Sequence, residues 1–318
     1  MLACLLTGVG CDPEPGSLRE RERRFARLSA AYPTPDAQSG TFDSDELMEW
    51  ASPDEQKLLY LNTPRMIRDY PWMGLLVLPF SSGPRPFCAA TLIAPRYALT
   101  AAHCVLDMGE ELIFGRAYIF SEEGQTVSVE RAFIHPGFEA ENYLNDIAVL
   151  RLDRALELKP VPLGSPPEQS DSRNRSLTIA PTRAAELYVE NQMPTTEISW
   201  GSAALFLGWG RNVDGYYSAR LRRADTSLAA HQECRAVYAD SGIKITDQMI
   251  CAGLRGDACS GDSGGPLLIV NERSQIRQIG IVSFGMGCGL AGYPGVYTRI
   301  DRYRDWIDAI LNGTDNPR

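Results

Sequence analysis

Three short segments of this sequence contain the residue types that nucleophilic hydrolysis needs. Ser263 lies in GDSGGP, His103 in TAAHC, and Asp146 precedes the apolar run IAVL. A serine hydroxyl is a weak nucleophile, so it requires a base, a carboxylate that orients the base, and donors for the oxyanion. The glycines around Ser263 would let backbone N–H groups approach a reacting carbonyl without a Cβ in the way. The segments therefore predict a hydrolytic site with a serine nucleophile, a histidine base and an orienting aspartate.

Each segment also has an ordinary structural interpretation. An aspartate before a strand is usually a turn residue, and an isolated histidine is more often structural than catalytic. The segment GDSGG also matches the nucleophile elbow of α/β-hydrolases, in which the histidine follows the serine. All 3 histidines, His103, His135 and His231, precede Ser263. Chain order therefore excludes the α/β-hydrolase fold and agrees with the order His, Asp, Ser of chymotrypsin-type enzymes.

Taken together, the three motifs resemble those of the trypsin/chymotrypsin family of serine proteases, over residues 70–311. The resemblance implies an all-β fold, a double six-stranded β-barrel with a C-terminal α-helix. It implies a serine endopeptidase that acts through an acyl-enzyme and needs no cofactor and no metal. It also implies three disulfides, Cys88–Cys104, Cys234–Cys251 and Cys259–Cys288. A trypsin-fold binding protein without activity and a secreted esterase are the alternatives.

The resemblance also assigns a primary specificity pocket. Asp257, six residues before Ser263, stands where trypsin-like members have an acid at the pocket floor. A buried carboxylate is costly unless it is paired, so it selects an Arg or Lys partner. Gly285 and Gly295 match the pocket walls, and Ser283 matches the residue that supports the buried catalytic acid. We therefore expect protein or peptide substrates with Arg or Lys before the scissile bond, although Asp257 also suits an exposed loop.

The oxyanion hole and the activation of the enzyme follow from the same resemblance. The N–H groups of Gly261 and Ser263 match the oxyanion donors. Family members are activated by cleavage before Ile-Val-Gly-Gly, and the freed α-amino group pairs with the acid before the catalytic serine, here Asp262. This sequence contains no Ile-Val-Gly-Gly. We predict cleavage after Lys57 instead, with cleavage after Arg65 or an internal cation as the alternatives.

Composition and cysteine usage narrow the function further. The chain has 318 residues, 44% hydrophobic and 22% charged, which is typical of globular proteins. Its net charge of −9 argues against a nucleic-acid partner. The 8 cysteines form no CxxC pair, so disulfides are favoured over zinc sites, and disulfides indicate an oxidising compartment. We expect a secreted or cell-surface monomer.

Three regions are expected along the chain. Residues 1–11 read as a signal or lipoprotein-type export segment, in which Cys11 is the candidate for a lipid anchor. Residues 12–57, rich in charged residues, Pro and Ser, read as a linker or pro-segment. Residues 58–318 would form the peptidase domain. Ordinary secretion and lipid anchoring at Cys11 both remain open.

Short apolar runs broken by Gly and Pro predict strands from residue 70 onward. They are expected at 74–78, 97–100, 127–134, 147–152 and 280–284. One amphipathic helix is expected near the end of the chain, with its apolar face at Tyr303, Trp306, Ile307, Ile310 and Leu311. Residues 165–205 read as a long polar surface insertion.

Overall fold

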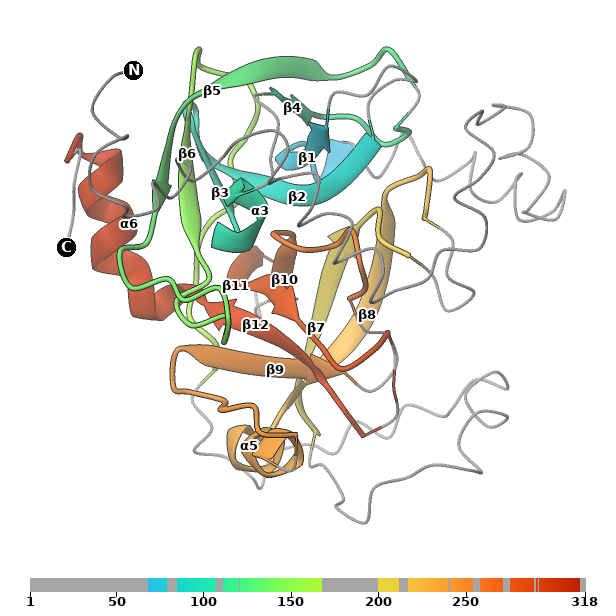
Figure 1. Ribbon diagram of the computed structural model, residues 1–318. Helices are drawn as coiled ribbons and strands as arrows, with labels where there is room; N and C mark the ends of the chain where they lie inside the picture. Colours follow the sequence, from blue (N-terminus) through green and yellow to red (C-terminus); the bar gives the residue numbers. More distant parts are fainter. Residues whose placement is uncertain are drawn as a thin grey trace, which may run out of the picture. The chain divides into compact units, whose positions relative to one another are not determined.

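The computed structural model describes residues 68–78, 85–106, 111–119, 121–167, 200–211, 217–239, 241–253, 258–270, 275–288, 290 and 292–314. Within them the chain forms two closed antiparallel barrels of six strands each, one after the other in the sequence (Figure 1). This confirms the predicted double barrel. The predicted export segment, linker and cleavage sites at Lys57 and Arg65 lie outside the described residues.

The first barrel is closed in the strand order β1-β2-β3-β6-β5-β4. Its strands are β1 (Met73–Leu78), β2 (Arg85–Ala94), β3 (Tyr97–Thr100), β4 (Glu111–Phe114), β5 (Gln125–Ile134) and β6 (Ala148–Leu152). The strand predicted at 97–100 has the predicted bounds, and those at 74–78, 127–134 and 147–152 fall on β1, β5 and β6. Ala148, Val149 and Leu150 of β6 are all buried. Since successive side chains of a strand point to opposite faces, this strand is covered on both faces.

The second barrel is closed in the order β10-β11-β12-β9-β8-β7. Its strands are β7 (Trp200–Gly208), β8 (Arg222–Ala229), β9 (Met249–Gly253), β10 (Pro266–Val270), β11 (Ile276–Phe284) and β12 (Gly295–Arg299). The expectation of an insertion over 165–205 is wrong at its end, because residues 200–205 belong to β7. Pairing of β7 with both β8 and β10 makes a strand of this weakly apolar sequence.

Helices are short and lie outside the barrels. They are α3 (Ala102–Leu106), α5 (His231–Ala239), η2 (Ile300–Tyr303) and α6 (Arg304–Leu311). The predicted C-terminal helix is confirmed as α6 (Figure 1). Its buried Trp306, Ile307 and Ile310 belong to the same core cluster as residues of the first barrel. Among the described residues, no helix has the length and apolar character that a membrane crossing requires.

Hydrogen bonds join the two barrels where the candidate residues lie. The Ala89 amide of β2 donates to Ser263 O at 2.7 Å, and the Trp209 indole donates to Ala117 O at 3.3 Å. The Thr91 hydroxyl donates to Gln278 Oε1 at 2.8 Å, and both residues are fully buried. The turn before β10 and the strand β11 are therefore both held against β2 of the first barrel.

Candidate active site

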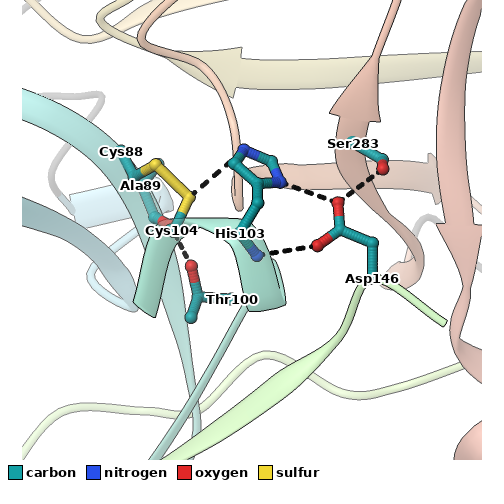
Figure 2. The surroundings of a disulfide bond; sticks show 7 residues. All are labelled: Cys88, Ala89, Thr100, His103, Cys104, Asp146 and Ser283. Carbon is teal, nitrogen blue, oxygen red and sulfur yellow. Dashed lines mark hydrogen bonds and ion pairs between the residues drawn. A yellow bond between two sulfur atoms is a disulfide. The ribbon is translucent and has the colours of Figure 1, made fainter. Parts of the chain in front are cut away.

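Asp146 and His103 are in direct contact, as Figure 2 shows. His103 Nδ1 donates to Asp146 Oδ2 at 2.7 Å, and the His103 amide donates to Oδ1 at 2.9 Å. His103 lies on α3, which follows β3 directly, and Asp146 lies just before β6, the strand that pairs with β3. Because neighbouring strands end at the same edge of the barrel, the two side chains meet. His103 Nε2 remains on the other side of the ring, 3.7 Å from Cys104 Sγ.

The Asp146 carboxylate is fully buried and its charge is balanced by donors. Burial by itself would raise its pKa, but the charge and two hydrogen bonds of His103, together with the Ser283 hydroxyl, hold the pKa below its usual value. Ser283 Oγ donates to Asp146 Oδ2 at 2.5 Å (Figure 2). Thr298 Oγ1 of β12 donates to Asp146 O at 2.8 Å. The second barrel thus supports an acid that belongs to the first.

The turn before Asp146 has an unusual backbone that is fixed by side chains. Asn145 has φ of 52°, which few non-glycine residues adopt. Its Nδ2 donates to Gly137 O at 2.6 Å, and its Oδ1 accepts from the Tyr303 hydroxyl at 2.9 Å. The left-handed turn at Asn145 directs the next residue, Asp146, toward His103. The C-terminal segment therefore contributes to the site through Tyr303.

Ser263 lies in the turn before β10, half-buried, and its carbonyl accepts the Ala89 amide. The next residue, Gly264, has φ of 78°, and a Cβ there would overlap Thr100 Oγ1 and Ala89 O. Only glycine allows this approach to the end of β3. Since α3 begins at Ala102, immediately after β3, the Ser263 turn is packed against the segment that carries His103.

Two amides of the Ser263 turn, those of Gly261 and Ser263, make no backbone hydrogen bond among the described residues. Gly261 has φ of 97°. Within the described ranges, neither the Gly261 nor the Ser263 amide donates to a backbone acceptor, whereas the Asp262 amide donates to Cys259 O at 2.9 Å. Alternate amides of one turn are thus available to an oxygen of a ligand. A pair of such donors is the arrangement that an oxyanion requires.

Asp262 is buried between two glycines. The Gly210 amide donates to its Oδ1 at 2.7 Å and the Cys259 amide to its Oδ2 at 3.0 Å. A Cβ at Gly208 or Gly210 would overlap the carboxylate. Burial raises the Asp262 pKa to about 6, because the two amides and the more distant charge of Arg222 offset only part of the desolvation. The segment Gly208-Trp209-Gly210 therefore forms the cradle of this acid.

The predicted pocket walls come together at one end of the second barrel. Phe284, the last residue of β11, pairs with Val296 of β12, so Gly285 and Gly295 lie at the same end of this strand pair. The disulfide Cys259–Cys288 connects this end to the Ser263 turn. The predicted pocket acid, Asp257, lies outside the described residues.

All three disulfides that the resemblance implied are present. They are Cys88–Cys104, Cys234–Cys251 and Cys259–Cys288. Cys88–Cys104 joins β2 to α3 beside the His103 ring (Figure 2). In the part of the chain that the structure describes, one group of possible metal ligands is compact, namely Cys88, His103 and Cys104. Both sulfurs are oxidised in the disulfide, so the thiolates that bind metals are not formed there.

Tyr143 is a residue of the site that sequence reasoning missed. Its ring meets the His103 ring edge-on at 5.5 Å between centroids and lies 5.2 Å from the Phe284 ring. It has φ of 52° in a loop without apolar periodicity, so no sequence signal pointed to it.

The other two histidines have structural surroundings. His135 Nδ1 accepts a hydrogen bond from the Gly137 amide at 3.1 Å in a turn. Its ring packs edge-on against Tyr303 and Trp306. His231 opens α5, and its Nε2 lies 3.4 Å from Asp247 Oδ1. Desolvation by burial lowers the pKa of both imidazoles. Their contacts are with a turn, with aromatic rings and with Asp247, so we assign neither of them a catalytic role.

Two closed six-stranded barrels with an Asp–His pair and a Gly-rich serine turn at their junction define the chymotrypsin-like class of fold. The family model named Trypsin matches residues 62–307. The chain therefore belongs to the trypsin family of serine-type endopeptidases.

Three relatives illustrate the similarity. Serine protease 7 of Drosophila melanogaster is 32% identical over 275 residues, which cover 78% of this chain and 64% of that protein. Phenoloxidase-activating factor 3 of Holotrichia diomphalia is 33% identical, with 75% and 68% covered. Human tissue-type plasminogen activator is 33% identical, with 76% and 42% covered. The chain thus spans about two thirds of the insect relatives and less than half of the human one.

Proposed function

We propose that this chain is an active serine endopeptidase in which Ser263, His103 and Asp146 form the catalytic triad. The observation that carries the proposal is the buried Asp146 carboxylate, whose Oδ2 accepts a hydrogen bond from His103 Nδ1 at 2.7 Å. This bond fixes the tautomer in which Nε2 is unprotonated and able to act as a base. A buried carboxylate is costly unless it is paired, and here its partners are the candidate base and Ser283.

The reaction would proceed in two halves. As Ser263 Oγ bonds to the scissile carbonyl carbon, its proton passes to His103 Nε2, and Asp146 stabilises the imidazolium. The same proton then goes to the leaving amine as the C–N bond breaks, which gives the acyl-enzyme. Water repeats the sequence, so that the acid is released and Ser263 regains its proton. The amides of Gly261 and Ser263 would bind the oxyanion in both halves.

We propose Arg or Lys as the residue before the scissile bond. Gly285 and Gly295 at the ends of β11 and β12 would leave the pocket open to a long side chain, and Asp257 would bind the cation. Replacing Asp257 by Ser should abolish this preference, because the cation would be buried without its partner at a cost of about 3–5 kcal/mol. An unchanged cleavage profile would show that Asp257 is not the pocket floor.

Activation by cleavage after Lys57 is proposed as the source of a cation for Asp262. The raised pKa of this buried acid supports the proposal, since a bonded ammonium would stabilise the carboxylate. Such an ammonium would have a pKa above its ordinary range of about 7.7–8.0, and activity should fall reversibly as it loses its proton in alkali. N-terminal sequencing of the active form tests this. An active chain that is continuous through residues 50–70 would point to an internal cation.

The proposed enzyme acts outside the cell, as a monomer and without a cofactor. The three disulfides support an oxidising compartment. The names of two relatives record the activation of phenoloxidase and of plasminogen, and for this chain we propose only the shared chemistry, hydrolysis of peptide bonds in proteins. Cys11 is the proposed attachment point if the protein is lipid-anchored, and mass spectrometry of the mature protein would detect the lipid.

A fluorophosphonate probe tests the proposed function directly. The purified protein should be labelled at Ser263, and Ser263→Ala should not be labelled and should lose about 10⁶-fold in kcat. Cleavage-site profiling with a peptide library then tests the Arg or Lys preference. A folded protein that neither labels nor cleaves would be a binding protein instead. A strong preference for esters over matched amides would indicate an esterase.

A further inference from the structure

The Arg211–Tyr217 pair borders the Ser263 turn and has no part in the chemistry described above. Arg211 and Tyr217 form an isolated antiparallel bridge after β7. The Arg211 amide donates to Ser260 O at 3.0 Å, and a Cβ on Gly261 would lie 2.8 Å from Tyr217 Cε1. The pair is therefore packed directly against the residue whose amide is the proposed oxyanion donor.

The Arg211 guanidinium is held in place but lacks an anion. Its Cζ lies 4.8 Å from the centroid of the Tyr217 ring, and the Tyr217 side chain is 44% exposed. Arg211 Nε is buried without a hydrogen-bond acceptor. Arg223, for example, pairs with Asp225 at 2.8 Å, whereas no carboxylate within the described ranges pairs with Arg211. Stacking on a ring leaves the N–H edge of a guanidinium free for a planar acceptor.

Barrel topology places this guanidinium on a particular side of the scissile bond. The Ser263 turn leads into β10, which pairs with β7 on one side and with β11 on the other. The proposed pocket walls follow β11 and begin β12, while Arg211 follows β7. A substrate whose acyl half enters the pocket therefore has its leaving half on the β7 side. Arg211 faces that half.

We propose that Arg211, stacked on Tyr217, is a subsite for an acidic side chain in the part of the substrate that follows the scissile bond. A carboxylate can accept two parallel hydrogen bonds from the Nη atoms of a guanidinium, and these atoms of Arg211 are not among the buried atoms without a partner. The preferred substrate would then carry a cation before the bond and an anion after it. This inference rests on the proposed peptidase function.

The test uses peptides with Arg before the bond and either Glu or Gln at each of the first three positions after it. At one of these positions the wild-type kcat/KM should be about three- to tenfold higher for Glu than for Gln. The ratio should decline as salt is raised, because the pair is partly exposed. Isosteric Gln controls for size, so the ratio reports charge alone.

Variants assign the preference to Arg211. Arg211→Ala should bring the Glu/Gln ratio to about one, and Arg211→Glu should favour Lys at the same position. Arg220→Ala is the matched control, because the Arg220 Cζ lies 4.9 Å from the Tyr118 ring in the same kind of stack but has no contact with Gly261. It should keep the wild-type ratio. Tyr217→Phe should also keep it, since the ring is retained.

Two outcomes would overturn the inference. One is a wild-type ratio near one at all three positions in an enzyme that cleaves these peptides. The other is a ratio that survives Arg211→Ala. Binding of the same uncleaved peptides to Ser263→Ala, measured by fluorescence anisotropy, gives the Glu/Gln ratio without catalysis. An enzyme inactive on every peptide would therefore count against the proposed function, while the binding ratio still decides on Arg211.

Discussion

Two aspartates, one at the junction end of each barrel, are buried to almost the same degree but have different hydrogen-bond donors. Asp146 is 0% exposed and Asp262 is 5% exposed. Asp146 accepts three hydrogen bonds, from the His103 amide, His103 Nδ1 and Ser283 Oγ. Asp262 accepts two, both from neutral amides. The pKa of Asp146 is lowered, whereas the pKa of Asp262 is raised to about 6.

The difference shows that burial alone does not decide the charge of a carboxylate. Desolvation is the largest influence on both acids and raises both pKa values. The net pKa shift is downward at Asp146, because a basic ring and a hydroxyl donate hydrogen bonds to the same carboxylate. At Asp262 no cation within the described ranges is hydrogen-bonded to the carboxylate. The charge of the Asp146 carboxylate is thus stabilised by its neighbours, whereas a cation would be needed to stabilise the Asp262 carboxylate to the same extent.

The largest effect should come from removing the charge at Asp146. In Asp146→Asn the amide nitrogen would face His103 Nδ1, so Nδ1 would become the acceptor and Nε2 would carry the proton. Nε2 could then no longer act as the base for Ser263. We expect kcat/KM on an Arg peptide to fall roughly 10⁴-fold, with the fold retained. A loss of less than tenfold, in a variant whose circular dichroism is unchanged, would contradict the role of Asp146.

The corresponding experiment at Asp262 concerns stability and pH. Its pKa rises from 3.8 to about 6 on folding, so the folded state holds the proton more tightly. The stabilising contribution is present below about pH 4 and is lost as pH rises through about 6, a change of about 3 kcal/mol. Urea unfolding of Ser263→Ala, with and without Asp262→Asn, should show this decline only where Asp262 is present.

The chain cleaved after Lys57 provides a second test of the Asp262 environment. Cleavage after Lys57, introduced with an external protease, should flatten the decline, because the new ammonium would stabilise the carboxylate. If Asp262 and Asp262→Asn proteins lose stability in parallel from pH 4 to pH 7, the raised pKa is wrong. If the cleaved and continuous chains behave alike, the proposed ion pair does not form.

The sequence predicted one of these two environments better than the other. His103, Asp146 and Ser283 stand in motifs, and the structure brings all three into contact. The cradle of Asp262 was not predicted, because Gly208 and Gly210 are distant in sequence and their role appears only when β7 and β10 pair. Motifs record side-chain chemistry, whereas close backbone approach depends on the tertiary fold.

Loops and weak strands limited the rest of the prediction. Trp200-Gly201-Ser202-Ala203 reads as loop, since its small residues carry little strand signal, yet pairing in a closed barrel makes it part of β7. Tyr143 and Asn145 both have positive φ, and their positions depend on contacts with His103 and Tyr303. Neither contact leaves a periodic pattern in the sequence. The specificity acid Asp257 stays a prediction.

Filling the Asp262 cradle should have a moderate effect. Gly208→Ala would place a methyl group against the carboxylate, and we expect a loss of about 1–3 kcal/mol in the free energy of unfolding. Gly201→Ala is the control on the same strand, since its nearest neighbour would be Leu228 O at 3.5 Å. The loss at Gly208 should shrink in an Asp262→Ala background. Equal losses with and without the carboxylate would exclude this overlap as the cause.

The smallest effect should come from removing one donor to Asp146. Ser283→Ala deletes the hydroxyl that bonds to Oδ2, which should cost about 1 kcal/mol at neutral pH, because His103 still donates two hydrogen bonds to the buried carboxylate. The Asp146 pKa is lowered on folding, so this contribution is present above the unfolded value of 3.8 and is lost as pH falls through the lower folded value.

Thr298→Val is the matched control for Ser283→Ala, because it deletes a hydroxyl that bonds to the carbonyl oxygen of the same residue at 2.8 Å. That carbonyl does not titrate, so the loss in Thr298→Val should be the same at neutral and at acid pH. Unfolding of both variants in the Ser263→Ala background, followed from pH 7 down to the lowest pH at which the protein stays folded, makes the comparison. The cost of Ser283→Ala should shrink as the pH falls through the lowered pKa of Asp146, since a protonated carboxyl needs its donors less. Two variants with the same pH dependence would mean that Ser283 supports the backbone around Asp146 and not its charge.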